Sequence, residues 1–218
     1  MDSETSNATD NSRRKWLKSA CLSPTLLLFS EQSQAGAQIE EPLADAVRIA
    51  MRNAVHSSDP PIPEFKDTPS YIQYLRWLGE MSERLKPKKR DFQTRKEFLQ
   101  TVWYESKRAG LDTALVLGLI QVESGFKKYA ISWVGARGYM QIMPFWLRVL
   151  AEDTDKHSTS HLFNMQTNIR FGCVILRHYL DRENGNLFLA LGRYNGSRGK
   201  AAYPDAVLAA KKQWEFAG

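Results

Sequence analysis

Cysteine is scarce in this chain of 218 residues, which contains only Cys21 and Cys173. Two cysteines allow at most one disulfide, and removal of an N-terminal leader would leave none within the remaining chain. Ile169, Cys173, Leu176 and Leu180 recur at helical spacing, so we expect Cys173 to be a core thiol and not a nucleophile. A hydrophobic content of 43% suffices for one well-buried domain with accessory helices, or at most two small domains.

The apolar run near the N-terminus, Ala20 to Phe29, is too short to be a stable transmembrane anchor. It follows a basic stretch, Ser12 to Lys18, and precedes the small residues Ala35-Gly36-Ala37. This order predicts a cleavable export signal over residues 1–37 and a periplasmic protein. The paired arginines favour the twin-arginine route over an ordinary secretory leader. Cys21 lacks the residues that precede a lipidated cysteine, so we expect no lipid anchor.

Signals for metal, phosphate and nucleophilic chemistry are weak. His157 and His161 lie in a polar loop without a Cys or Glu at metal spacing, so no metal is predicted. The segment Gly135-Ala136-Arg137-Gly138 neither follows a strand nor opens a long helix, which argues against a phosphate loop. Ser124 lacks the setting of a nucleophilic serine. No convincing strand or repeat is found, so the predicted class is mainly α, without a cofactor.

The formal net charge is +6. This charge is equally consistent with a polyanionic partner and with the mild basicity of many soluble proteins. Its densest basic segment is Lys86-Pro87-Lys88-Lys89-Arg90. No interleaved aromatics or recognition motif accompany this segment, so we expect a solvated linker and no binding of nucleic acid.

Two amphipathic helices are predicted before the centre of the chain. The first begins at Thr68-Pro69, with Thr68 as N-cap. We expect Trp77 to pack, with sugar stacking as the alternative. The second begins at the capping box Thr94 to Glu97 and ends near Ala109-Gly110. The predicted inward residues are Ile72, Leu75, Leu78, Leu85, Trp77 and Met81 in the first helix, and Phe98, Val102 and Trp103 in the second.

The most informative stretch runs from Asp112 to Pro144. Asp112 is suited to cap a nearly all-apolar helix, Leu115 to Val122, which belongs inside a protein. Glu123 follows this segment, and Gly125 is suited to end the helix. We therefore expect a carboxyl at the end of a buried helix, with a raised pKa that makes it a usable general acid. The alternative is a capping or ion-paired glutamate.

Polar and sulfur-bearing side chains downstream are candidates to line a groove for amide-bearing sugars. They are Ser132, Met140, Gln141 and Met143. For Met140, core filling is an equally good interpretation. Tyr194-Asn195-Gly196 adds a hydroxyl beside a backbone that can be approached closely.

Three motifs in this order resemble the lytic transglycosylases, the soluble, lysozyme-like enzymes (SLT domain) that cleave bacterial peptidoglycan. The motifs are Glu123-Ser124-Gly125-Phe126, then Ala130-Ile131-Ser132 with Gly135 to Pro144, and Ala190 to Gly196. The resemblance covers about residues 94 to 214. It implies a lysozyme-like (goose-type/SLT) catalytic domain over 94–218, preceded by an N-terminal helical extension over 38–93. Tyr139, where the family usually has Leu, and Gly192-Arg193 depart from the pattern.

The resemblance further implies that Glu123 is the single acid and base. It would protonate the glycosidic oxygen between N-acetylmuramic acid and N-acetylglucosamine and then close a 1,6-anhydro ring. Ser132, Gln141, Met143 and Tyr194 would contact the glycan, with Ser124, Met140 and Asn195 in support; we expect Asn195 to hold the turn that presents Tyr194. The expected partner is the peptidoglycan glycan strand, and the expected state is a monomer.

Two alternatives remain open for the function. One is a goose-type, lysozyme-like muramidase that hydrolyses the same bond with water. The other is a non-catalytic protein that binds the cell wall on the same fold, against which the retained Glu123 argues.

Overall fold

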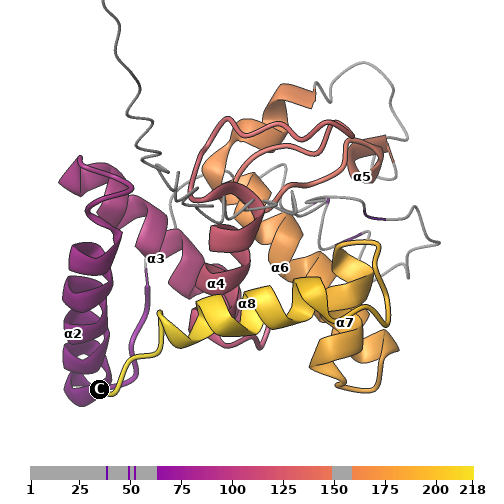
Figure 1. Cartoon of the computed structure of the whole chain (residues 1–218). Helices are drawn as coiled ribbons and strands as arrows, with labels where there is room; N and C mark the ends of the chain where they lie inside the picture. Colours follow the sequence, from indigo (N-terminus) through magenta and orange to yellow (C-terminus); the bar gives the residue numbers. More distant parts are fainter. Residues whose placement is uncertain (1–37, 39–48, 50–51, 53–62, 149–158) are drawn as a thin grey trace, which may run out of the picture. The chain divides into compact units, whose positions relative to one another are not determined.

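The computed structural model describes Gln38, Ile49, Arg52, residues 63–148 and residues 159–218. All of them belong to one compact unit, Gln32–Gly218. Figure 1 shows the helices α2 (Thr68–Leu85), α3 (Phe92–Arg108), α4 (Thr113–Ser124), α5 (Phe145–Arg148), α6 (Met165–Arg182), α7 (Leu187–Tyr194) and α8 (Ala202–Lys212), with a 3-10 turn at Thr159–Phe163. In these ranges extended pairing is limited to the isolated bridges Ile131–Arg137 and Arg137–Ile142. The predicted mainly α class is confirmed.

Helix α4 is the buried centre of the unit. The Asp112 carboxylate accepts a hydrogen bond from the Ala114 N–H at 2.9 Å, and Gly125 ends the helix in the left-handed conformation with a φ of 55°. Both predicted boundaries are therefore confirmed. Ten of its residues are buried, so α4 contacts other elements on every side, as its uniformly apolar sequence requires. This places the final turn, which carries Glu123, inside the protein.

Helix α8 packs against α4, which it crosses in Figure 1. A Cβ atom at Gly118 would lie 2.6 Å from the backbone nitrogen of Lys211, so only glycine lets the two backbones approach this closely. At one end of the crossing Lys211 Nζ lies 3.0 Å from the Asp112 carboxylate. At the other end the start of α8 meets the last turn of α4. Tyr203, which follows Glu123 by 80 positions in the sequence, is thereby brought to Glu123.

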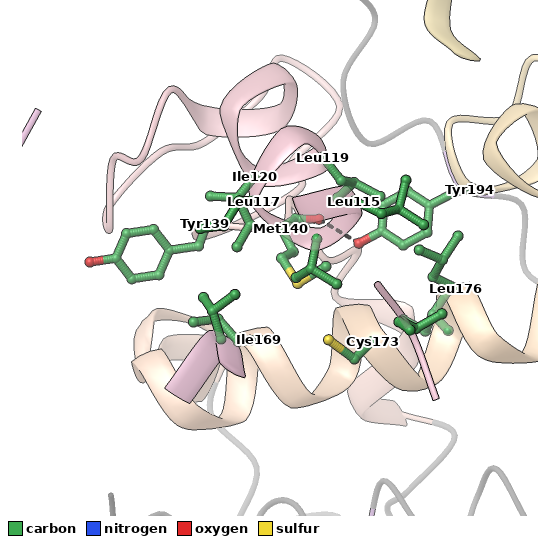
Figure 2. Packing of buried hydrophobic residues seen from close by; sticks show 14 of the residues in the cluster. Leu115, Leu117, Leu119, Ile120, Tyr139, Met140, Ile169, Cys173, Leu176 and Tyr194 are labelled. Atoms are coloured by element: carbon green, nitrogen blue, oxygen red, sulfur yellow. Dashed lines mark hydrogen bonds between the residues drawn. The ribbon is translucent and has the colours of Figure 1, made fainter. Parts of the chain in front are cut away.

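Helix α6 forms the opposite wall of the core. Ile169, Cys173 and Leu176 face α4 across Met140, as Figure 2 shows. Cys173 is 1% exposed and unpaired, and burial raises its pKa well above the ordinary value, so the prediction of a core thiol is confirmed. The core is continuous from α3 through α4 to α6 and α7. It includes buried side chains of the segment between α4 and α6, which fix that segment in place.

The buried face of α2 differs in part from the predicted one, since Trp77, Met81 and Leu85 are buried as predicted. Ile72 and Leu75 are 45% and 44% exposed, whereas the buried hydrophobic residues are Tyr74, Trp77, Met81 and Leu85. Both sets have helical spacing, and the larger aromatic surface is the one that is buried, since it removes more apolar area from water. The prediction of an inward Ile72 and Leu75 is wrong.

The predicted helix starts are slightly misplaced. Asp67, not Thr68, caps α2, and its carboxylate accepts from the Ser70 N–H at 2.8 Å. Helix α3 starts at Phe92, two residues before the predicted capping box, because the Asp91 carboxylate accepts from both the backbone and the hydroxyl of Thr94. Its predicted end at Ala109-Gly110 is confirmed.

The basic segment after α2 is more than a solvated linker. Lys89 donates to the Tyr139 hydroxyl at 2.7 Å, and burial lowers the pKa of this lysine to about 8. The buried Arg95 guanidinium donates to the Lys89 and Arg90 carbonyls at 2.8 and 2.6 Å. The turn between α2 and α3 is thus held by Lys89 and by Arg95 of α3.

The predicted export signal, residues 1–37, lies outside the described residues, as do segments 39–48 and 53–62 of the predicted extension. In the part of the chain that the structure describes, no helix combines the length and the apolar character that crossing a membrane needs.

Candidate active site

Glu123 lies in the last turn of α4 and is 6% exposed. Tyr203, at the start of α8, donates a hydrogen bond to its Oε1 atom. Its Oε2 atom is buried and has no hydrogen-bond partner among the described residues. The carboxyl group is therefore held on one side and free on the other.

Burial raises the pKa of Glu123 to about 8, and the hydrogen bond from Tyr203 opposes this rise. No cation and no second carboxylate of the described residues contributes to the shift. An arginine or lysine within about 4 to 6 Å would lower the pKa, and a second carboxylate would raise it further. Glu123 is thus mostly protonated at neutral pH because burial disfavours its charged form, and it retains a proton that it can donate.

Tyr203 was not found by sequence reasoning, which named Tyr194 as the tyrosine of the site. The Tyr194 hydroxyl donates instead to the Met140 carbonyl at 2.8 Å, drawn as the dashed line in Figure 2. Tyr194 is still close enough for the charge of Glu123 to raise its pKa, although burial is the larger cause. Only the close crossing of α4 and α8 brings Tyr203 to the acid, and no local motif marks that contact.

Gln38 reaches the same region from the N-terminal part of the chain. Its Oε1 atom accepts a hydrogen bond from the Trp146 indole at 2.6 Å, and both side chains are buried. The Gln38 side chain also lowers the pKa of Tyr194, so it lies close to that hydroxyl. Sequence reasoning assigned no role to either Gln38 or Trp146.

The segment between Ala130 and Ile142 folds into a compact loop beside Glu123. Arg137 and Ile142 exchange backbone hydrogen bonds of 3.0 and 2.9 Å, and the Gly138 N–H donates to the Ala130 carbonyl at 2.9 Å. Gln141 is 2% exposed, and its amide nitrogen donates to the Gly138 and Ala130 carbonyls at 2.9 and 3.2 Å. The donor side of the Gln141 amide is therefore used to hold the loop.

Asn168 on α6 fixes this loop to the core. Its amide oxygen accepts from the Met140 N–H at 2.8 Å, and its nitrogen donates to the Arg137 and Leu162 carbonyls at 2.9 and 2.7 Å. A Cβ atom at Gly138 would lie 2.3 Å from the same amide nitrogen, and Gly138 has a φ of 78°, so the position requires glycine. Sequence reasoning assigned no role to Asn168, because its central role depends on contacts that the sequence does not display.

The other candidate residues differ in exposure. Met143 and Ser132 are partly exposed, and the Ser132 hydroxyl oxygen accepts from the Ala136 N–H at 3.0 Å, which leaves its proton available. Met140 is fully buried and packs against Gly172, so core filling accounts for it. Ser124 is buried and donates to the Tyr139 carbonyl at 2.7 Å. Asn195 ends α7, and its side chain donates to the Ser197 hydroxyl at 3.0 Å.

The two departures from the family pattern have structural partners. Tyr139 is 2% exposed, and its ring lies 5.0 Å from Phe98 with the Lys89 ammonium above it. Arg193 forms an ion pair with Glu183, whose pKa falls to about 2 beside Arg198 and Arg193. Neither departure contributes to the shifted pKa of Glu123.

Residues 63–148 and 159–218 contain no group of three His, Cys, Asp or Glu side chains that could hold a metal ion. His157 of the predicted metal-free loop lies outside the described residues.

Comparisons with known proteins agree on one family. A family model described as Transglycosylase SLT domain matches residues 100–216. A membrane-bound lytic murein transglycosylase C of Mannheimia succiniciproducens is 37% identical over 85 residues, which are 37% of this chain and 24% of that protein. A protein of the same name from Histophilus somni is 33% identical over 116 residues, 47% of this chain and 31% of that protein. The chain thus aligns with only a quarter to a third of the length of these relatives.

Among solved structures, an inactive mutant of the lytic transglycosylase Slt from Pseudomonas aeruginosa is 22% identical, with a TM-score of 0.42. The similarity covers 66% of this chain and 27% of that chain.

Proposed function

The chain belongs to the transglycosylase SLT-domain family, whose model covers just over half of it, and from this premise we propose that it is a peptidoglycan lytic transglycosylase. The observation that carries the proposal is the state of Glu123. This carboxyl is buried, has a pKa of about 8, and has neither a cationic partner nor a neighbouring carboxylate among the described residues.

The first step is protonation of the glycosidic oxygen between N-acetylmuramic acid and N-acetylglucosamine by Glu123. The bond from C1 of the muramic acid to this oxygen breaks, and the oxygen leaves as a hydroxyl. The oxygen of the 2-acetamido group of the same sugar stabilises the cationic C1. The unpartnered Oε2 atom of Glu123 supports its role as the proton donor, since nothing in the described chain competes for that proton.

In the second step the Glu123 carboxylate takes the proton from the C6 hydroxyl of the muramic acid while that oxygen bonds to C1. The product is a 1,6-anhydro ring, and no water is consumed. Most glycosidases need two carboxyl groups about 5 to 10 Å apart. No second carboxylate of the described residues contributes to the pKa of Glu123, which supports a mechanism in which one group performs both proton transfers.

We assign the neighbouring residues by their exposure. Ser132 and Met143, which are partly exposed, contact the glycan. Gln141 and Tyr194 shape the site through the loop carbonyls that they bind. Tyr203 positions the carboxyl of Glu123. The substrate lies in the cell wall, so the proposed place of action is the periplasm; the twin-arginine route remains a prediction.

The products of sacculus digestion test this proposal. Mass spectrometry should find anhydro-muramyl ends, lighter by one water than hydrolysed ends, with the wild type and with Glu83→Gln. Glu83→Gln is a matched control because Glu83 is an exposed glutamate of α2 that pairs with Lys86. Glu123→Gln should yield no product. Hydrolysed ends would instead indicate a lysozyme-like muramidase, and wall binding without any product would indicate a scaffold.

A further inference from the structure

A cavity lies at the other end of α4 from Glu123. It has a volume of about 650 Å³ and is lined in part by Asp112, Thr113 and Ala114, where α4 begins. Glu123 comes ten residues after Thr113, which is roughly 15 Å along the helix. Neither Glu123 nor Tyr203, Ser132, Gln141, Met143 or Tyr194 lines this cavity. It is therefore separate from the candidate active site but is built on the same helix.

Aromatic rings form most of the apolar wall of the cavity. They are Phe65, Tyr74, Trp77, Trp103, Trp214 and Phe216. The Phe65 ring lies 4.9 Å from Tyr74 and 5.4 Å from Trp103, and Tyr74 meets Trp103 edge-on at 5.0 Å. Because Phe65, Tyr74 and Trp103 hold one another, this part of the wall is ordered before a ligand arrives, which lowers the cost of binding.

Polar side chains complete the lining. Ser70 and Gln73 come from α2, Lys107 from α3, and Glu215 from the C-terminal tail. The tail is held against α2 by the Arg84 guanidinium, which donates to the Gln213 and Glu215 carbonyls at 2.8 and 2.9 Å. Figure 1 shows the C-terminus beside α2. These four polar side chains are exposed, so they are available to form hydrogen bonds with an occupant that carries hydroxyl or amide groups.

The two halves of the lining come from different parts of the chain. Phe65, Ser70, Gln73, Tyr74 and Trp77 precede residue 100, where the match to the SLT family begins. Trp103, Lys107 and the stretch from Trp214 to Phe216 belong to the matched domain. The cavity therefore exists only because α2 packs on the catalytic domain, and this gives the N-terminal extension a function.

We propose that this cavity is a second glycan-binding site, which holds the sugar backbone of peptidoglycan away from the point of cleavage. Its volume is in the range of ligand sites, about 300 to 1,000 Å³. A hexosamine unit offers an apolar C–H face to the rings and hydroxyl and amide groups to the polar side chains. The choice of occupant rests on the proposed function. A strand held here has a raised effective concentration at Glu123.

The test uses the full chain carrying Glu123→Gln, which cannot turn over glycan, and glycan strands that an amidase has freed of stem peptides. Nuclear magnetic resonance of the indole N–H groups reports where the strands bind, with Trp103 and Trp214 assigned through variants. We expect both signals to shift. Trp103→Ala and Phe216→Ala should weaken binding by about fivefold or more, while Trp103→Phe retains most of it. Phe92→Ala removes an exposed aromatic of the same helix and should change nothing.

Melting temperatures show that the variants are folded. Indole signals of Trp103 and Trp214 that stay unmoved by saturating glycan would overturn the proposal. So would shifts caused by free stem peptides and not by stripped glycan. The sacculus products of the wild type are measured separately: anhydro ends together with an unresponsive cavity would refute the second site alone, and a responsive cavity without any product would refute the proposed activity alone.

Discussion

Two buried glutamates on neighbouring helices have opposite surroundings. Glu105 on α3 is 2% exposed and accepts a hydrogen bond from the Arg170 guanidinium of α6 at 2.8 Å, with Arg108 at 3.9 Å. Glu123 on α4 is 6% exposed, and among the described residues its carboxyl has a hydrogen bond only from the neutral Tyr203. Burial is the largest influence on both pKa values and raises them, but only Glu105 has cations that oppose the rise. Depth alone therefore does not identify an acid catalyst; the absence of a counter-charge does.

The largest expected effect is on turnover. Glu123→Gln should lower the rate of glycan cleavage by about 10²- to 10⁴-fold, because the proton donor is lost, while the protein stays folded. Glu105→Gln should leave the rate per folded molecule unchanged. Release of soluble fragments from sacculi, normalised to the folded fraction, measures both. An equal loss in the two variants would remove the distinction between the glutamates.

The next effect is on the pH dependence of stability. A carboxyl whose pKa is raised on folding, from 4.5 to about 8 for Glu123, binds more protons in the folded state. Its contribution therefore favours folding at low pH and is lost as pH rises from about 4.5 to about 8. The free energy of unfolding of Glu123→Gln minus that of the wild type should grow over this window by ~4 kcal/mol. Urea unfolding at several pH values measures it, and a flat difference would contradict the assignment.

Breaking the paired glutamate should cost stability directly. Glu105→Gln leaves the buried Arg170 without its carboxylate partner, which destabilises by about 3 kcal/mol and lowers the melting temperature by roughly 6 to 12 °C. Thermal unfolding followed by circular dichroism measures this change. An unchanged melting temperature would mean that Arg170 does not depend on Glu105.

The smallest expected effect comes from Tyr203. Tyr203→Phe removes the hydrogen bond that lowers the pKa of Glu123, so that pKa should rise further and the alkaline decline in turnover should move to higher pH. Loss of the held orientation should slow turnover by about tenfold at neutral pH. Tyr194→Phe is the control, because its hydroxyl serves the Met140 carbonyl. Tyr194→Phe should lower stability without moving the pH dependence of turnover. If Tyr194→Phe moved the alkaline decline and Tyr203→Phe did not, Tyr194 and not Tyr203 would be the residue that sets the pKa of Glu123.

Sequence reasoning succeeded where the cause is local. Asp112, the apolar run and Gly125 define α4 through capping and helix-ending chemistry within one stretch, and this places Glu123 in the core. The helical spacing around Cys173 likewise identifies a core thiol. These features depend on residues within a few turns of each other, so the chain displays them directly.

Sequence reasoning failed where the cause is a distant contact. Helix α2 has apolar residues on more than one side, and only its packing on α3 decides that Tyr74 is buried and Ile72 exposed. Tyr203 reaches Glu123 because Gly118 lets α8 approach α4, and a glycine within an apolar helix does not name its partner. The aromatic cavity joins three separate stretches of chain, which no spacing rule connects.

The measurement that tests the central claim most directly is the pKa of Glu123 itself. Protein labelled with ¹³C at glutamate carboxyl carbons gives a signal for each side chain, and the signal that is missing in Glu123→Gln is that of Glu123. We predict that it titrates near pH 8, so that the group carries a proton at neutral pH. Titration at or below pH 4.5, the ordinary value of a glutamate, would mean that Glu123 is ionised at neutral pH and would contradict its role as the general acid.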